Sequence, residues 1–105
     1  RGASLEGWST EELSDYVPMF WEVLASFSEW EKAQFVIFVT ASERVPLRGW
    51  QDLGLIVQKL DVSEYRLPTA HTCFSQLLLP RYPTREVLRK SLLSAAANSE
   101  GFGLR

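Results

Sequence analysis

Cysteine and histidine are scarce in this chain of 105 residues, which contains one of each, Cys73 and His71. A single cysteine can form neither an internal disulfide nor a cysteine-rich zinc site, and such usage is typical of a reducing compartment. Long hydrophobic runs are also missing, since stretches such as Phe35–Val39 are far too short to span a membrane. No secretory signal pattern is present. We therefore expect an intracellular protein, cytoplasmic and/or nuclear, with no membrane partner.

A marked excess of charge is absent as well. The net charge is −2, and the lysines and arginines are scattered along the chain. This distribution gives no electrostatic footprint for a nucleic acid or an anionic membrane. No phosphate loop, EF-hand or zinc signature occurs, so we expect no metal and no organic cofactor. The length suits one domain, and a start at Arg1 rather than Met suggests a fragment of a longer protein.

Helix signals dominate the first half of the chain. Ser9 and Glu12 have the spacing of a capping box, which predicts a short helix there. Pro18 is tolerated in a first turn, so we expect a second helix to start near it and to end near Ser28. Its predicted apolar face consists of Phe20, Val23, Leu24 and Phe27.

Ser28 is a suitable cap for a further helix over Glu29–Thr40. The apolar content of this helix is so dense that we expect burial on more than one side. Large aromatic residues dominate protein cores, and we assign five of them to the core: Trp21, Trp30, Phe35, Phe38 and Trp50.

Strand signals appear in the second half. Residues 41–53 are broken by Pro46 and Gly49 and should form a loop with one helical turn near Trp50. Strands are expected over Leu55–Leu60 and Cys73–Leu79, separated by a polar loop. Thr84 should then cap a last helix, which buries Leu88, Leu92, Ala95 and Ala96 and stops near Gly101. The predicted fold class is α+β, a single compact lobe with a small β-sheet packed against several α-helices.

The pair formed by His71 and Cys73 is the main candidate for chemistry. In an extended segment, residues two apart point to the same side, and an imidazole can favour the reactive thiolate form of cysteine. A lone cysteine, however, is often only a small buried hydrophobe. Because Cys73 follows a loop that contains Pro68, we predict that it is solvent-accessible and lies at the start of a strand. A thiol hydrolase would need a base and an orienting group that meet the sulfur in space. The remaining covalent use is acyl transfer through a thioester, in which positioning matters more than strong acid–base machinery.

Several short segments then occur in the order typical of one family. They are Phe20-Trp21-Glu22-Val23, Phe38-Val39-Thr40, Arg44-Val45-Pro46-Leu47, Gly49-Trp50, Leu67-Pro68-Thr69-Ala70-His71-Thr72-Cys73-Phe74, Leu79-Pro80-Arg81-Tyr82 and Gly101-Phe102-Gly103. In these segments the chain resembles the C-terminal lobe (C-lobe) of a HECT-type E3 ubiquitin ligase. The similarity extends from about Pro18 to the end of the chain.

The resemblance implies a function for four residues. Cys73 matches the cysteine that takes ubiquitin from a charged E2 enzyme as a thioester and delivers it to a substrate lysine. His71 and Thr72 match the residues that shape the catalytic loop. Phe102 matches a phenylalanine of the C-terminal tail that many members need for ligation, and which anchors the tail on the other lobe.

The resemblance also implies a domain layout and partners. Residues 18–105 would be the HECT C-lobe, and residues 1–17 a hinge, a linker or the last element of the larger N-lobe. That N-lobe, which recruits the E2, is missing from this chain. The implied partners are ubiquitin, a ubiquitin-charged E2 and protein substrates.

Two departures from the family pattern limit the comparison. Ser75 stands where the family commonly has Asn, so an amide role there is in doubt. The chain ends in Arg105, whereas some members end in an acidic residue that helps the acceptor lysine. The competing hypothesis is a non-catalytic module that binds ubiquitin or another protein while Cys73 stays idle, and a thiol hydrolase is a third.

Overall fold

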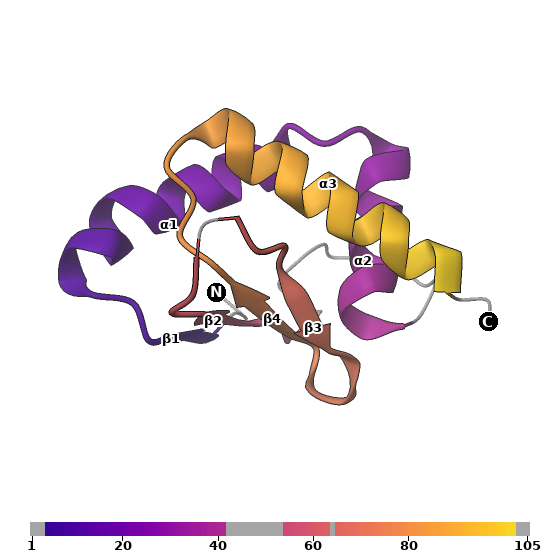
Figure 1. The fold of residues 1–105 in the computed structure, drawn as a ribbon, viewed down its shortest axis with the longest axis horizontal. Helices are drawn as coiled ribbons and strands as arrows, with labels where there is room; N and C mark the ends of the chain where they lie inside the picture. Colours follow the sequence, from indigo (N-terminus) through magenta and orange to yellow (C-terminus); the bar gives the residue numbers. More distant parts are fainter. Residues whose placement is uncertain (1–3, 42–53, 64, 103–105) are drawn as a thin grey trace.

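The structure, a computed structural model, describes residues 4–41, 54–63 and 65–102, with side chains up to residue 97. Three α-helices and four short strands form this part of the chain (Figure 1). In chain order they are β1 (Ser4–Glu6), α1 (Thr10–Ala25), α2 (Glu29–Thr40), β2 (Ile56–Lys59), β3 (Thr69–His71), β4 (Gln76–Leu79) and α3 (Arg85–Phe102). The predicted α+β class is confirmed. The loop predicted over residues 42–53, with Trp50, and the residues after Phe102 lie outside the described part.

The sheet is mixed, with the strand order β1-β2-β4-β3. Strands β1, β2 and β4 run parallel, and β3 pairs antiparallel with β4 at one edge. The strand predicted over Leu55–Leu60 is confirmed as β2. Strands β1 and β3 were not predicted, because each has three residues and lies at an edge of the sheet, where little apolar patterning is required.

Helix α1 is a single helix, so the predicted second start at Pro18 is wrong. Ser9 and Glu12 form the expected capping box, and Pro18 lies inside the helix. A proline there removes one backbone hydrogen bond and costs about 3 kcal/mol. Tyr16 and Phe20, on either side of the proline, are both buried. Their burial, at roughly 1.5–3 kcal/mol for each large apolar side chain, offsets that cost.

Helix α2 has the predicted bounds, with a capping box between Ser28 and Glu31. The assignment of Trp30 to the core is wrong, because its side chain is 65% exposed. Trp30 lies about two and a half turns before the fully buried Val39, which places the two on opposite sides of the helix. Phe35 and Phe38 are buried as expected.

Helix α3 also follows the prediction, except at its end. The Thr84 hydroxyl accepts a hydrogen bond from the Val87 amide, and Leu88, Leu92, Ala95 and Ala96 are buried. The helix continues through Gly101 to Phe102, so Gly101 does not stop it.

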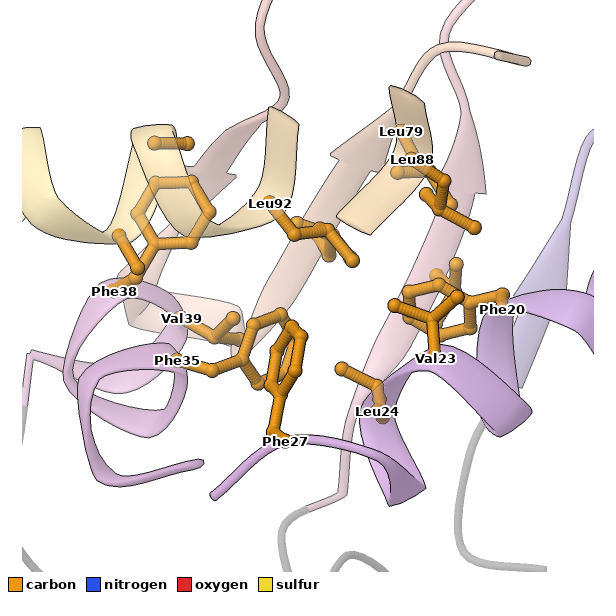
Figure 2. Packing of buried hydrophobic residues seen from close by; sticks show 14 of the residues in the cluster. Phe20, Val23, Leu24, Phe27, Phe35, Phe38, Val39, Leu79, Leu88 and Leu92 are labelled. Carbon is orange, nitrogen blue, oxygen red and sulfur yellow. The ribbon is translucent and has the colours of Figure 1, made fainter. Parts of the chain in front are cut away.

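The hydrophobic core lies between the helices and one face of the sheet (Figure 2). Leu77 and Leu79 of β4 point into it, and Val57 of β2 lies beside them in the register. The intervening Leu78 is only half buried, which is the alternation expected of a strand with one covered face. The burial of Leu77 and Leu79 therefore fixes the register of β4, and with it the position of residues 72–75, which directly precede this strand.

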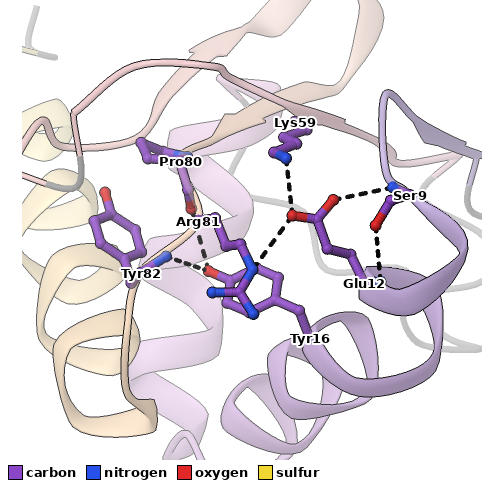
Figure 3. A network of polar contacts seen from close by, with 7 residues as sticks. All are labelled: Ser9, Glu12, Tyr16, Lys59, Pro80, Arg81 and Tyr82. Carbon is purple, nitrogen blue, oxygen red and sulfur yellow. Dashed lines mark hydrogen bonds and ion pairs between the residues drawn. The ribbon is translucent and has the colours of Figure 1, made fainter.

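A polar network holds α1 to the far end of β2 and β4 (Figure 3). The buried Glu12 carboxylate accepts from Lys59 Nζ at 2.8 Å and lies 3.3 Å from Arg81 Nε. The bond from Lys59 and the bond from the Ser9 amide hold the pKa of Glu12 below its usual range, despite burial. Close by, the Tyr16 hydroxyl donates to the Pro80 carbonyl and accepts from the Tyr82 amide, both at 3.1 Å.

Candidate functional site

Cys73 lies in a turn between β3 and β4. The strand predicted over Cys73–Leu79 is confirmed as β4, but it begins three residues later than predicted, at Gln76. Residues Thr72–Phe74 form a single turn of 3-10 helix, which we call the Cys73 turn. His71 and Gln76 are the last pair of the antiparallel ladder, so the residues between them must reverse the chain. Because His71 and Cys73 do not share an extended segment, the expectation that they point the same way no longer has a basis.

The Cys73 turn is open to solvent. Cys73 is exposed, Phe74 is 66% exposed, and His71 and Thr72 are exposed as well. In Figure 1 the connection from β3 to β4 protrudes at the bottom of the view, beyond the end of the sheet. The predicted accessibility of the Cys73 thiol is confirmed, and the thiol is not a buried hydrophobe.

Ser75 closes this turn, and sequence reasoning gave it no positive role. Its amide donates to the Thr72 carbonyl at 3.3 Å, and its own carbonyl accepts from the Ile56 amide of β2 at 3.0 Å. Ser75 has φ 51° and ψ 46°, the left-handed region that non-glycine residues seldom occupy. The sequence held one sign of this conformation. The resemblance gives Asn at this position, and Asn enters the left-handed region more readily than most residues.

A hydrogen bond between two neutral side chains lies at the base of the turn. Gln76 Nε2 donates to Gln58 Oε1 at 2.5 Å, which links β4 to β2 directly beneath the turn. Helix α2 packs against the turn from the core side. None of the ion pairs found among the described residues involves residues 69–76. In the whole described part of the chain, no group of three or more aspartate, glutamate, histidine or cysteine side chains could hold a metal ion.

The arrangement suits reaction with a large partner. An exposed thiol on a protruding turn can meet a carbonyl group carried by another protein, whereas enzymes that act on small molecules usually enclose their reactive group in a cleft.

The described helices include none long and apolar enough to cross a bilayer.

Comparison with known proteins decides the family. The family profile described as "HECT-domain (ubiquitin-transferase)" matches residues 3–105. The chain belongs to the HECT family.

Individual proteins that are similar to this HECT chain support the same family assignment. It is 41% identical over 88 residues, 84% of its length, to "Probable E3 ubiquitin-protein ligase HERC4" of Homo sapiens. It is 38% identical over 104 residues, 99% of its length, to "Probable E3 ubiquitin-protein ligase HECTD2" of Mus musculus. It is 43% identical over 98 residues, 86% of its length, to "E3 ubiquitin-protein ligase UPL1" of Arabidopsis thaliana.

The HECT chain is much shorter than these relatives. The matched region is 8% of HERC4, 13% of HECTD2 and 3% of UPL1. Of the four site residues expected from sequence, His71, Thr72 and Cys73 are consecutive members of one hairpin. Phe102 is the last residue of α3 in sequence, and its side chain lies outside the described part.

Proposed function

We propose that this chain is the catalytic C-lobe of a HECT ubiquitin ligase and that Cys73 carries ubiquitin as a thioester. The observation that supports the proposal most directly is the exposure of the only cysteine on a protruding turn. A ubiquitin-charged E2 supplies the donor, and a lysine of a protein substrate receives it. Residues 18–105 correspond to the C-lobe, and residues 1–17 to a hinge, a linker or the last N-lobe element.

The chemistry consists of two acyl transfers and no redox step. The Cys73 thiolate attacks the thioester carbonyl carbon of the charged E2. A C–S bond to Cys73 forms, the C–S bond to the E2 breaks, and the E2 sulfur leaves as a thiolate. A lysine amine then attacks the same carbon, an amide C–N bond forms and the C–S bond to Cys73 breaks. The proton that the amine loses balances the thiolate, so that Cys73 is released as a thiol. The first transfer exchanges one thioester for another, so placement of the sulfur dominates its rate.

His71 and Thr72 act in this proposal as supports of the turn. Thr72 supplies the carbonyl that receives the Ser75 amide. His71 ends β3 and pairs with Gln76, so it fixes where the turn begins.

The test offers a ubiquitin-charged E2 to the chain with the larger lobe of the family restored, followed by a non-reducing gel. We expect an adduct that a thiol reductant removes. Cys73→Ala should abolish the adduct, and Cys73→Ser should give little adduct, as a more stable oxyester, and no ligation, since a serine hydroxyl without a base is a much weaker nucleophile. Normal ligation by Cys73→Ser would refute the assignment.

The same experiment separates the two other hypotheses. A non-catalytic binding module would bind ubiquitin or another protein without forming an adduct at Cys73. A thiol hydrolase would release free ubiquitin from conjugates when no acceptor lysine is present.

Phe102 has its own test, because we propose that it docks on the larger lobe. Phe102→Ala should then leave the melting temperature of this 105-residue chain unchanged. In the restored catalytic domain it should slow lysine transfer more than thioester formation. A large loss of melting temperature with both transfers intact would instead mean that Phe102 packs within its own lobe.

A further inference from the structure

We infer that Ser75 is a positioning residue for Cys73, and that its left-handed backbone conformation holds the thiol out of the sheet. The inference rests on the proposed function of Cys73 and names a residue that this function needs. Three observations carry it: the backbone angles of Ser75, its hydrogen bonds on both sides, and the register of the hairpin.

The Ser75 amide closes a ring around the reactive residue. Its bond to the Thr72 carbonyl encloses Cys73 and Phe74 as the two central residues of the turn. This hydrogen bond holds the backbone of Cys73 in the turn. The direction of the Cys73 side chain therefore depends on the Ser75 amide pointing back toward Thr72.

The Ser75 carbonyl fixes the same turn to the sheet. It accepts from the Ile56 amide at the start of β2, one residue before β4 begins its own pairing with β2. A residue at position 75 can make both bonds only if the chain turns sharply between its amide and its carbonyl. The left-handed conformation with φ 51° and ψ 46° provides that turn.

The pairing around the turn leaves little freedom to adjust. His71 pairs with Gln76, and the next pair inward is Ala70 with the fully buried Leu77. A shift of one residue would move Leu77 out of the core. A residue that avoids the left-handed region therefore has to break the bond to Thr72 or the bond to Ile56, and either change moves Cys73.

Residue types differ strongly in this conformation. Gly adopts it freely, and Asn adopts it more readily than most residues. Ala resembles Ser in its steric demand, and a β-branched residue such as Val is a genuine outlier with positive φ. The backbone preference at this position can therefore be varied in a series of four variants: Ser75→Gly, Ser75→Asn, Ser75→Ala and Ser75→Val. Of these, Ser75→Ala removes the hydroxyl with little change in backbone preference.

The chain offers a matched control. Ala41, the exposed C-cap of α2, is the other non-glycine residue with positive φ in the described part, at 60°. Ala41→Gly and Ala41→Val impose the same change of backbone preference at a position outside the hairpin.

Two rates are measured for each variant of this chain, together with its melting temperature. The first is alkylation of Cys73 by a small reagent, followed as a function of pH. The second is loading with ubiquitin that is activated as the thioester of a small thiol, which requires no E2. We expect Ser75→Gly, Ser75→Asn and Ser75→Ala to load ubiquitin within about threefold of the parent. Ser75→Val should load ~10- to 100-fold more slowly, the range expected when a reacting atom is displaced by about an ångström.

Ala41→Val should lower the melting temperature without a comparable loss of loading. Equal loading by Ser75→Val and the parent, or equal losses in Ser75→Val and Ala41→Val, would overturn the inference. A loss in Ser75→Ala as large as in Ser75→Val would also overturn it, because the hydroxyl would then be the active feature. If neither the parent chain nor any variant is loaded, the same series is measured in the catalytic domain with the larger lobe restored and a charged E2. Failure of the parent there refutes the proposed function, whereas loading of the parent with equal loading by Ser75→Val refutes only the inference about Ser75.

Discussion

Tyr16 shows how one polar atom in the core joins two distant parts of the chain. Its hydroxyl donates to the carbonyl of Pro80 and accepts from the amide of Tyr82, so both backbone groups at the end of β4 have a partner. Burial raises the pKa of Tyr16 to about 12. The hydroxyl therefore stays protonated, and able to donate, throughout the physiological range.

Tyr16→Phe should lower the free energy of unfolding by about 1–3 kcal/mol, because it leaves a buried amide and a buried carbonyl without a partner. Chemical denaturation at pH 7 would measure the loss. The control is Tyr65→Phe, since Tyr65 is 89% exposed and its replacement should change nothing. Equal stability of the Tyr16→Phe variant and the parent would contradict the assigned role of the hydroxyl.

At the scale of elements, the capped starts of the helices were predictable and the hairpin was not. Ser9 with Glu12 and Ser28 with Glu31 announce their helices locally, because a capping box satisfies backbone groups within four residues. The Cys73 turn has no comparable signal. Its shape depends on the positive φ of Ser75 and on a bond to Ile56, which lies 19 residues earlier in the chain.

Cys73 became the candidate nucleophile for a different reason. The resemblance drew attention to Cys73 through the order of short segments, without knowledge of the turn. The accessibility of Cys73 followed correctly from its position after Pro68, although the strand begins at Gln76 and not at Cys73. The role inferred here for Ser75 was out of reach, because a serine in a sequence does not reveal its backbone angles.

Pro18 offers a test at the level of one helix. Because it is exposed and lies inside α1, Pro18→Ala restores an amide that can donate to the Ser14 carbonyl. We expect the free energy of unfolding to rise by about 1–3 kcal/mol, the cost of an interior proline less the greater freedom of the unfolded chain. The control is Pro83→Ala, in the exposed connection before α3, which should give no gain. A Pro18→Ala variant no more stable than the parent would mean that the helix already compensates for the missing bond.

The whole molecule depends on Glu12, because its carboxylate joins the start of α1 to the ends of β2 and β4. Lys59 and Arg81 both reach it, and its side chain is only 10% exposed. This network lies at the opposite end of β4 from the Cys73 turn, so it supports the sheet without touching the site. Variants of the network should therefore change stability and leave the alkylation rate of Cys73 in the folded protein unchanged.

The pH dependence of stability follows from the direction of the Glu12 shift. The folded-state pKa lies below the ordinary value of 4.5. The unfolded state therefore takes up a proton first as the pH falls. The contribution of Glu12 is fully present well above pH 4.5 and is lost as the pH falls through the lowered folded-state pKa. Glu12→Gln should reduce the free energy of unfolding by about 1.5–3 kcal/mol at pH 7, the range for hydrogen bonds to a charged group.

The comparison of parent and variant across pH makes this prediction specific. As the pH falls below 4.5, the difference in stability between the parent and Glu12→Gln should shrink, because the parent loses the charge that the variant never had. Glu11→Gln is the control, since Glu11 lies exposed beside Glu12 in the first turn of α1. Its stability should stay within about 1 kcal/mol of the parent, the range for a carboxylate in the first turn of a helix. A difference between parent and Glu12→Gln that stays constant down to pH 3 would show that the charge of Glu12 does not stabilise the fold, and that the side chain acts through its packing alone.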